Sequence, residues 1–407
     1  MGVTCHPLIL VCYSDKGFGG VSPLLGGKSS GVFQHRARTE RMDDHKPGGD
    51  WEDAIHSGLP DFYRDIKSVP VTVEAVSFEE KRIETEHRMF ERTIIRVRGE
   101  GVTGFGEDVT RSREAHNRLR EDGLALPTGD WTVGTFSDAL DADSNILTQT
   151  ASRDAPEYLR WAIESAVLDL ALKQSGRSLA SVLDRTYEPM AFVVSLQLGD
   201  SPHIRPVNRF LDADSDIEFK IDVPDTPSDE LLSALSDTGA VRILDLKAQY
   251  GSDVGAPTDP DLYRQLFETF PDALIEDPAV TDTTRPVLDE YADRVSWDAP
   301  ITGVESIQEL PWVPAALNIK PCRSGTLESL CRILEYGLQH DVELYGGGMF
   351  ELDAGRAHSQ ALASLFYPNG PNDLAPPAYH TYRADKSYPS SPLEPPAKPA
   401  GIGWDIR

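Results

Sequence analysis

The sequence predicts an α/β protein: a (β/α) TIM-type barrel preceded by an amino-terminal α+β capping domain. Two patterns indicate this fold. After Met190, short apolar runs typical of buried strands alternate with helical segments, whereas before Met190 apolar and polar residues alternate around turn glycines. With 407 residues, the chain is also longer than one ordinary core requires, which favours a large barrel with a second, smaller domain.

Residues 1–41 differ in charge from the rest of the chain. They carry five basic and two acidic residues, a net charge of +3, whereas the whole chain carries -27. This reversal indicates an upstream extension with Met42 as the better start, and the alternative is a basic arm with a function of its own. We expect residues 1–60 to be disordered.

Residues 61–188 are expected to form the capping domain. The stretches "VTVEAVSFEEKRI" and "RTIIRVRGEGVTGFGEDV", which start at Val71 and Arg92, alternate as hairpin strands with one buried face do. The stretch "APEYLRWAIESAVLDLALKQSGRSL" then places its apolar residues on one helical stripe and ends at Gly176, a residue type typical of helix ends.

Residues 189–375 are expected to form the barrel, because the ends of eight predicted strands lie 22 to 31 residues apart, the length of one βα unit. These ends are Leu198, Asp222, Asp245, Glu276, Asp298, Lys320, Gly347 and Asp373. Polar residues at the carboxyl ends of barrel strands form the active face. The tail, residues 376–407, is rich in proline and serine, and we expect it to wrap over the surface.

The acidic composition limits the function classes. A net charge of -27 and a pI near 4.7 exclude nucleic acid and an anionic membrane as the main partner. Many carboxylates with few lysines suit a protein kept soluble in concentrated salt, so we expect a cytoplasmic protein of a halophile. The one apolar run near the amino terminus is too short to span a membrane. The four cysteines show no zinc spacing, and we expect reduced thiols.

Three carboxylates close three successive predicted strands. Asp245 ends "VRILD", Glu276 ends "DALIE" and Asp298 ends "RVSWD". Because the carboxyl ends of barrel strands meet on one face, these hard oxygen ligands are expected to converge on Mg²⁺; the alternative is solvated surface carboxylates. Lys320, in "ALNIKP" at the end of the next strand, is a candidate proton carrier, or a salt-bridge partner of these carboxylates.

The order of several short motifs carries a resemblance to a known family. "GFGEDV" and "AIESAVLDLALKQSGRSL" are followed by "FKIDV", "ILDLK", "LIEDP", "SWDAP", "NIKPCRSG" and "ELYGGGMFE". In this order they resemble the enolase superfamily, most closely the branch of mandelate racemase and muconate lactonizing enzymes. The resemblance covers about residues 70–400. It implies a capped barrel that uses Mg²⁺ and removes the proton α to the carboxylate of a small acid.

The resemblance also assigns roles to individual residues. It implies that Asp245, Glu276 and Asp298 are the three Mg²⁺ ligands. Lys220, in "FKIDV", matches the first lysine of the family's Lys-x-Lys pair on the second barrel strand, and Lys320 matches the lysine of the sixth strand. Both lysines are therefore candidate catalytic residues.

Two positions depart from the family pattern. Asp222 stands where the second lysine of the pair, often the proton-abstracting base, is found. Lys247 stands where an asparagine usually follows the metal ligand of the third strand. A lysine has thus moved one strand over, and we expect it to pair with Asp222. Lys220 and Lys247 are candidates for proton transfer, and the alternative is that either neutralises Asp222.

The chemistry of such a site follows from charge. A proton α to a carboxylate is weakly acidic because its removal places two negative charges on an enediolate. Mg²⁺ offsets that charge, and a lysine facing the cation is expected to have a pKa lowered towards neutrality, so that it accepts a proton. Lysines on opposite sides can act as base and conjugate acid. Arg323 is a candidate for binding the substrate anion, or a surface arginine, and Asp222 and Asp373 are candidate substrate contacts.

Three classes of function remain open. The first is a Mg²⁺-dependent isomerase or lyase that epimerises, cycloisomerises or dehydrates a small carboxylic acid. The second is a metal-independent Schiff-base lyase with Lys320 or Lys247 as the amine, and the third is a non-catalytic, metabolite-binding descendant. We expect a homo-oligomer. Substrate specificity is expected from the stretches around Gly101–Asp108 and Asn372–Tyr379.

Overall fold

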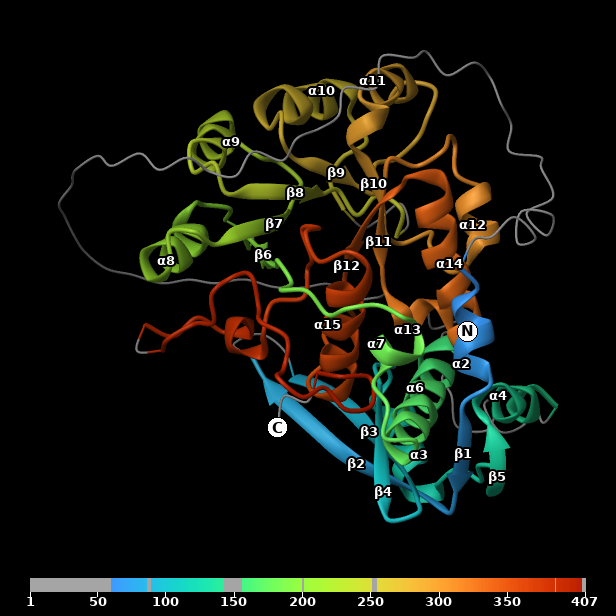
Figure 1. Ribbon diagram of the computed structural model, residues 1–407. Helices are drawn as coiled ribbons and strands as arrows, with labels where there is room; N and C mark the ends of the chain where they lie inside the picture. The colour runs from blue at the N-terminus through green and yellow to red at the C-terminus, as the bar shows by residue number, and fades with distance from the viewer. Residues whose placement is uncertain are drawn as a thin grey trace, which may run out of the picture.

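The computed structural model describes residues 60–85, 89–142, 156–199, 201–250, 255–384 and 386–404 (Figure 1). The extension expected at residues 1–60 lies outside the described residues, except for Pro60. The described chain forms an antiparallel amino-terminal part, a parallel sheet with helices around it, and a carboxyl-terminal segment that returns to the amino-terminal part.

In the described residues, the amino-terminal part forms two antiparallel sheets, as the alternating pattern predicted. The larger sheet has the order β2 (Ala75–Glu84), β3 (Met89–Gly99) and β4 (Val102–Asp108). The smaller sheet pairs β1 (Pro70–Val73) with β5 (Gly129–Thr132). The helices are α2 (Phe62–Lys67), α3 (Arg113–Asp122), α4 (Val133–Ala142), α6 (Pro156–Gln174) and α7 (Leu179–Val182).

The parallel sheet follows the order of the chain over its seven described strands (Figure 1). These are β6 (Val193–Gln197), β7 (Glu218–Asp222), β8 (Val241–Asp245), β9 (Leu274–Glu276), β10 (Val295–Trp297), β11 (Ala316–Ile319) and β12 (Glu343–Gly346). The helices of this part are α8 (Arg205–Ala213), α9 (Asp229–Ser236), α10 (Pro260–Thr269), α11 (Arg285–Glu290), α12 (Val304–Gln308), α13 (Pro321–Ser324), α14 (Leu327–His340) and α15 (Ala354–Phe366). Sequential parallel strands joined through helices make an α/β barrel-like fold. None of the described helices has the length and apolar character needed to cross a membrane.

Asn372 and Asp373 take the place of the eighth expected strand. The Val193 N–H donates to the Asn372 carbonyl over 2.8 Å, and the Asp373 N–H donates to the Gly346 carbonyl over 2.8 Å. This segment therefore joins the first strand of the sheet to the last. It forms a bridge and not a regular strand, because the prolines of "PNGPND" lack the N–H groups that a ladder requires. The side chains of Val193, Ile243, Leu274, Ala316 and Tyr345 form a separate apolar cluster, as expected inside a barrel.

The helix α6 is buried on all sides, whereas the sequence predicted one buried stripe. Every residue from Leu159 to Leu172 is buried. One side of α6 faces β4, where a Cβ on Gly104 or Gly106 would lie 2.1 or 1.9 Å from a backbone oxygen of the helix. The helix also contacts α13 and α14. It is therefore enclosed between the amino-terminal sheet and the barrel-like part, an environment that helical periodicity alone does not reveal.

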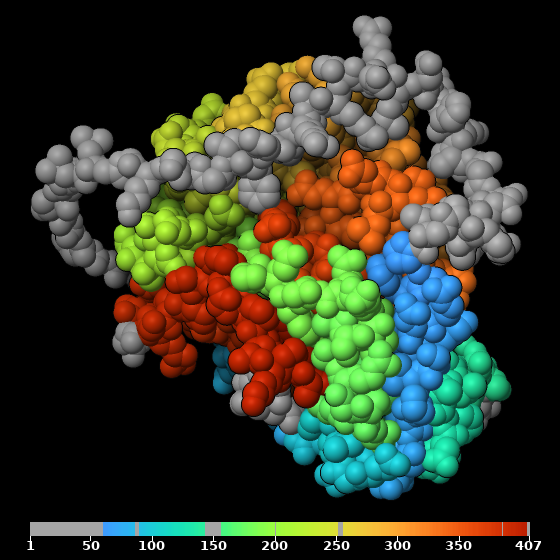
Figure 2. Space-filling model, viewed as in Figure 1, coloured from blue at the N-terminus to red at the C-terminus, as the bar shows by residue number. Residues whose placement is uncertain are grey.

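The carboxyl-terminal segment lies against the amino-terminal part. Gly401 bridges Ser178, next to α7, and the Ile402 N–H donates to Asp169 of α6 over 3.1 Å. Figure 2 shows this segment, in red, beside the green segment that contains α7. Hydrogen bonds between Met190 and Leu393 extend the same contact.

Glu335, on α14, holds the start of α2. Its carboxylate accepts the Phe62 N–H over 2.7 Å. Burial raises the pKa of Glu335 to about 7 against the effect of this hydrogen bond, and Asp61 adds repulsion. The folded chain therefore keeps the Glu335 proton at pH values where the unfolded chain has lost it.

We predict that Glu335→Gln makes the free energy of unfolding less dependent on pH. Because the folded-state pKa lies above the ordinary value of 4.5, the stability provided by this proton is present below about pH 4.5 and is lost as the pH rises to about 7. The variant cannot titrate at this position. Its free energy of unfolding should therefore fall less steeply between these pH values, and the difference in slope corresponds to less than one bound proton. Urea unfolding at pH 5 and pH 7.5 measures the slope, with Glu309→Gln at an exposed position as the control. Equal slopes in the wild type and Glu335→Gln would contradict the assignment.

Candidate active site

The three candidate metal ligands lie side by side at the carboxyl ends of neighbouring strands. Asp245 and Glu276 are the last residues of β8 and β9 and are paired in register. Asp298 follows β10 directly. All three residues are at most 1% exposed. The structure thus places them at one edge of the sheet, where their spacing in the sequence predicted.

Lys220, from β7, reaches across this row. Its Nζ donates to the carboxylate of Glu276, lies 3.1 Å from Asp245 Oδ2 and lies 3.8 Å from Asp373 Oδ2. Burial disfavours its charged form, yet Asp245 and Glu276 more than offset this, and the pKa of Lys220 is raised well above its ordinary value. Lys220 is therefore a buried ammonium group that neutralises the centre of the row.

Lys320 and Arg323 both bind Asp298. Lys320 Nζ donates to Asp298 Oδ2 over 2.7 Å, and Arg323 Nη1 donates to Oδ1 over 2.7 Å. The Tyr250 hydroxyl donates to Oδ2 over 2.9 Å and accepts from Arg323 Nη2 over 2.6 Å. Arg323 is buried, which excludes the alternative of a surface arginine. Its guanidinium donates to Asp298 and to Tyr250. Against the effect of burial, Arg323 and Lys320 hold the pKa of Asp298 below its usual range.

Lys247 pairs with Asp222, as the sequence predicted. Its Nζ lies 3.1 Å from Asp222 Oδ1 and 2.7 Å from Asp245 Oδ2. Gln197 also donates to Asp222, over 2.7 Å. The sequence led us to expect a pKa lowered towards neutrality for a lysine that faces bound Mg²⁺. Among the protein groups alone, the pKa of Lys247 is raised, because its carboxylate partners outweigh the effect of burial. Lys320 shows the same direction, through Asp298.

Five further residues complete the group. Asp277 accepts the Asp298 and Ala299 N–H groups over 2.8 and 2.9 Å and so fixes the end of β10. The sequence analysis missed Tyr250, Ser296, Asn318 and Tyr345. The Tyr345 hydroxyl donates to Glu276 and lies 2.9 Å from the Ser296 hydroxyl oxygen, and Asn318 donates to Glu276 over 3.2 Å. A signal was available for Ser296 and Asn318: each lies two residues before a candidate site residue, on the same face of its strand.

The group holds more carboxylates than cations. Its carboxylates are Asp222, Asp245, Glu276, Asp277, Asp298 and Asp373, and its cations are Lys220, Lys247, Lys320 and Arg323. With every group ionised, six carboxylates and four cations leave two negative charges. Burial raises the pKa of Glu276 to about 8 and that of Asp277 to about 7, and neighbouring carboxylates add to both shifts. Burial raises the pKa of Asp373 as well.

Mg²⁺ fits this group by its chemistry, although the carboxylates are arranged differently from the expectation. Over the described residues, no three acidic, histidine or cysteine side chains are placed to hold a metal ion. A lysine or arginine instead binds each of the expected ligands. The donors are nevertheless the hard oxygens that Mg²⁺ prefers, and two positive charges would balance the excess. The cation would compete with Lys220 for Asp245 and Glu276.

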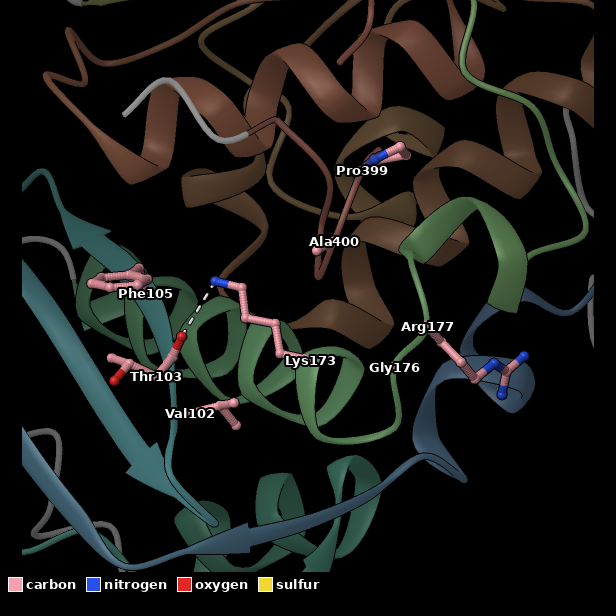
Figure 3. Close-up of a pocket in the computed structure, with 8 residues that line it drawn as sticks. All are labelled: Val102, Thr103, Phe105, Lys173, Gly176, Arg177, Pro399 and Ala400. Carbon is pink, nitrogen blue, oxygen red and sulfur yellow. Dashed lines mark hydrogen bonds between the residues drawn. The ribbon is translucent and has the colours of Figure 1, made fainter. Parts of the chain in front are cut away.

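A pocket of about 520 Å³ lies elsewhere, between β4, the end of α6 and the carboxyl-terminal segment (Figure 3). It shares no residue with the carboxylate group. Its Lys173 pairs with Asp169 over 2.6 Å and donates to the Thr103 carbonyl over 3.2 Å. The ammonium group of this pocket is therefore already bound within the protein.

Two models of one protein family match the chain. The family is described as "Domain of unknown function (DUF8230)". Its N-terminal domain model matches residues 64–182, and its C-terminal domain model matches residues 186–381. The two matches meet between α7 and β6.

Two relatives with named activities are similar in sequence. The chain is 25% identical over 296 residues to the o-succinylbenzoate synthase of Listeria innocua, which covers 64% of this chain and 77% of that protein. It is 26% identical over 304 residues to the N-succinylamino acid racemase of an Amycolatopsis species, which covers 72% of this chain and 78% of that protein.

Solved structures share the fold. A member of the enolase superfamily from Listeria innocua matches with a TM-score of 0.53 and 19% identity, over 75% of this chain and 83% of that chain. A dipeptide epimerase from Methylococcus capsulatus, complexed with Mg and a dipeptide, matches with a TM-score of 0.61 and 17% identity, over 82% of this chain and 99% of that chain. These likenesses support the α/β barrel-like fold.

We predict that Arg323→Met destabilises the protein by about 3–5 kcal/mol, because it removes one partner of a buried ion pair and adds to the negative excess. The matched control is Arg332→Met, which breaks an exposed ion pair with Glu328 and should cost less than about 1 kcal/mol. Urea unfolding of both variants at one salt concentration measures the difference. Equal small losses would show that Arg323 does not stabilise Asp298.

Proposed function

We propose that this chain, which belongs to the enolase superfamily in the branch of mandelate racemase and muconate lactonizing enzymes, is an enzyme. It would remove the proton α to a carboxylate of a small acid with the help of Mg²⁺. One observation carries the proposal: three buried carboxylates end neighbouring strands, and lysines flank both ends of their row. Acids of this kind are epimerised, cycloisomerised or dehydrated once the proton has left.

Asp245, Glu276 and Asp298 would hold the cation. When bound, Mg²⁺ supplies positive charge next to the substrate carboxylate, where negative charge develops as the proton leaves. Tyr345 and Asn318 hold Glu276 in place through hydrogen bonds to one of its oxygens. Such outer contacts orient a ligand without touching the cation.

The two lysines would transfer protons from two sides of the substrate. Lys247 binds Asp245 at one end of the row, and Lys320 binds Asp298 at the other. A substrate lying over the row would present one face to each amine. One lysine would take the proton as the neutral amine, once the charge of Mg²⁺ offsets the carboxylates that raise its pKa, and the other would return a proton as the ammonium ion. Lys247 would thus replace the lysine that Asp222 has displaced from β7.

The names of the relatives suggest substrates to try first. A synthase of o-succinylbenzoate and a racemase of N-succinylamino acids both indicate acids that carry a succinyl group. We propose N-succinylamino acids, dipeptides and cycloalkene carboxylates as probes. Incorporation of ²H at the α carbon in ²H₂O detects the common first step, whichever product follows.

The division of the chain stays part of the proposal. Residues 61–188 would cap the barrel formed by residues 189–375, and residues 376–407 would wrap back over the surface. Arg323, Asp222 and Asp373 remain candidates for contact with the small carboxylate substrate. The homo-oligomer and the halophilic cytoplasm stay predictions.

We predict that Lys320→Ala lowers α-proton exchange by a factor on the order of 10² to 10⁴, because it removes a general acid or base. Its affinity for Mg²⁺ should not weaken, because Lys320 is not a ligand and its loss leaves Asp298 more negative. Asp245→Asn should lose Mg²⁺ binding and exchange together. Calorimetric titration with Mg²⁺ and ²H incorporation measure the two properties, with Lys398→Ala at an exposed position as the control. Undiminished exchange in Lys320→Ala would refute the mechanism, and borohydride trapping of a substrate adduct would indicate the Schiff-base lyase.

We predict that Lys247→Met abolishes exchange on one face of the substrate and leaves exchange that depends on Lys320 on the other. The physical reason is that the two lysines bind opposite ends of the row of carboxylates. Measuring ²H incorporation separately for each enantiomer of a probe decides the matter. Turnover like that of the wild type would make Lys247 a structural partner of Asp222.

A further inference from the structure

A loop between β12 and α15 forms one wall of the candidate site. The Gly347 N–H donates to the Ile319 carbonyl over 3.0 Å, beside Lys320. A Cβ on Gly347 would lie 2.8 Å from Lys320 Cε, so the backbone of the loop rests against that lysine. Further along, the Met349 sulfur lies 3.9 Å from Arg323 Nη2. A shift of this loop would therefore displace the side chains of Lys320 and Arg323.

The other side of the loop is held by the amino-terminal sheet. Arg92, on β3, donates to the Met349 and Phe350 carbonyls over 2.6 and 3.1 Å. The Phe90 ring stacks on the Phe350 ring, with 3.8 Å between centroids. Phe350 has a φ of 64°, a conformation that a bulky residue adopts only when its surroundings impose it. Contacts from β3 thus fix a strained residue of the loop.

Glu107, on β4, contacts the end of this loop and the start of α15. Its carboxylate accepts the Leu352 N–H over 2.5 Å and the Asp353 and Gly355 N–H groups over 2.9 Å each. These donors surround the start of α15, where backbone N–H groups lack partners within the helix and attract negative charge. Asp353, at the capping position, makes no capping bond of its own and pairs instead with Lys81 over 2.9 Å. The helix α15 therefore starts on a cap supplied by another part of the chain, and Figure 1 shows α15 between the amino-terminal sheet and β12.

Burial makes the position of Glu107 costly for a carboxylate. The residue is 1% exposed. Burial raises its pKa to about 7, the N–H donors act in the opposite direction, and the nearby Glu351 adds repulsion. A glutamine would fill the same space without this penalty, but it would turn an N–H₂ group towards at least one of the three donors. The three hydrogen bonds of the cap therefore require the carboxylate form of Glu107.

We propose that Glu107 is a positioning residue of the candidate active site: by capping α15 from the amino-terminal sheet, it fixes the loop at residues 347–353 against Lys320 and Arg323. The catalytic meaning of this contact rests on the proposed function, because that proposal gives Lys320 its role. Glu107 itself does not touch the reacting atoms. It acts through the loop, whose one end rests on Lys320 and whose other end is the start of α15.

The test compares Glu107→Gln with the matched control Lys81→Gln in the full chain. Lys81 joins the same two parts at the same helix start, but through a half-exposed ion pair that contributes little. In Glu107→Gln, amide exchange of residues 352–355 should become about 10- to 100-fold faster, because hydrogen bonds to a charged acceptor are lost. Acylation of Lys320 by acetic anhydride, followed by peptide mass spectrometry, should become several-fold faster. In Lys81→Gln, both rates should stay within about twofold of the wild type.

Each outcome decides the proposal. Faster amide exchange with unchanged Lys320 acylation would show a cap that does not position the site, and the proposal would be overturned, as it would be if neither rate changed. If Glu107→Gln does not fold, Glu107→Asp keeps the charge, shortens the side chain by one methylene and should raise both rates to a smaller degree. Neither measurement uses a substrate or Mg²⁺. Failure to find α-proton exchange would therefore count against the proposed function and leave this inference standing.

Discussion

The burial of too many carboxylates at one edge of the sheet is the constraint on which the rest of the site depends. Carboxylates removed from water must be paired, hydrogen-bonded or protonated. The chain uses all three means. Lys220 and Arg323 neutralise members of the row, Tyr345 donates a hydrogen bond to Glu276, and the pKa of Glu276 rises to about 8. The proton on Glu276 offsets part of the negative excess that the group carries with every member ionised, and a bound divalent cation would offset that excess in its place.

The same constraint explains where the lysines stand. An aspartate in place of the expected lysine on β7 adds one negative charge and removes one positive charge from the group. Lys247, one strand over, lies within 3.1 Å of that aspartate, Asp222, and within 2.7 Å of Asp245. The exchange leaves the number of lysines in the group unchanged and places one amine beside Asp245, at one end of the row. With Lys320 beside Asp298, the row then has an amine at each end.

Spacing along the sequence predicted the features that repeat, and only those. The strand ends at Asp222, Asp245 and Glu276 were predicted to the residue. Each closes a short apolar run, and these runs recur at the length of one βα unit. The eighth strand was predicted as regular and is a short bridge, because proline and glycine near Asn372 outweigh the repeat. Tyr250 lies in a loop, where no periodicity marks it. Contacts between distant segments, such as Glu107 with Gly355, leave no trace in local pattern, because they depend on how two finished elements dock.

That last class of contact matters most for how the site keeps its shape. The carboxylates of the row are neutralised by side chains, which can move, whereas Glu107 is stabilised by backbone N–H groups at the start of α15, which move only with the helix. A charge bound to backbone therefore ties β4 to α15 more rigidly than an ion pair between flexible side chains would. Because the loop before α15 rests on Lys320, the amino-terminal sheet takes part in setting the geometry of a lysine that it never touches. Glu107, a buried carboxylate outside the candidate metal site, thus links the packing of the amino-terminal sheet to the geometry of the candidate active site.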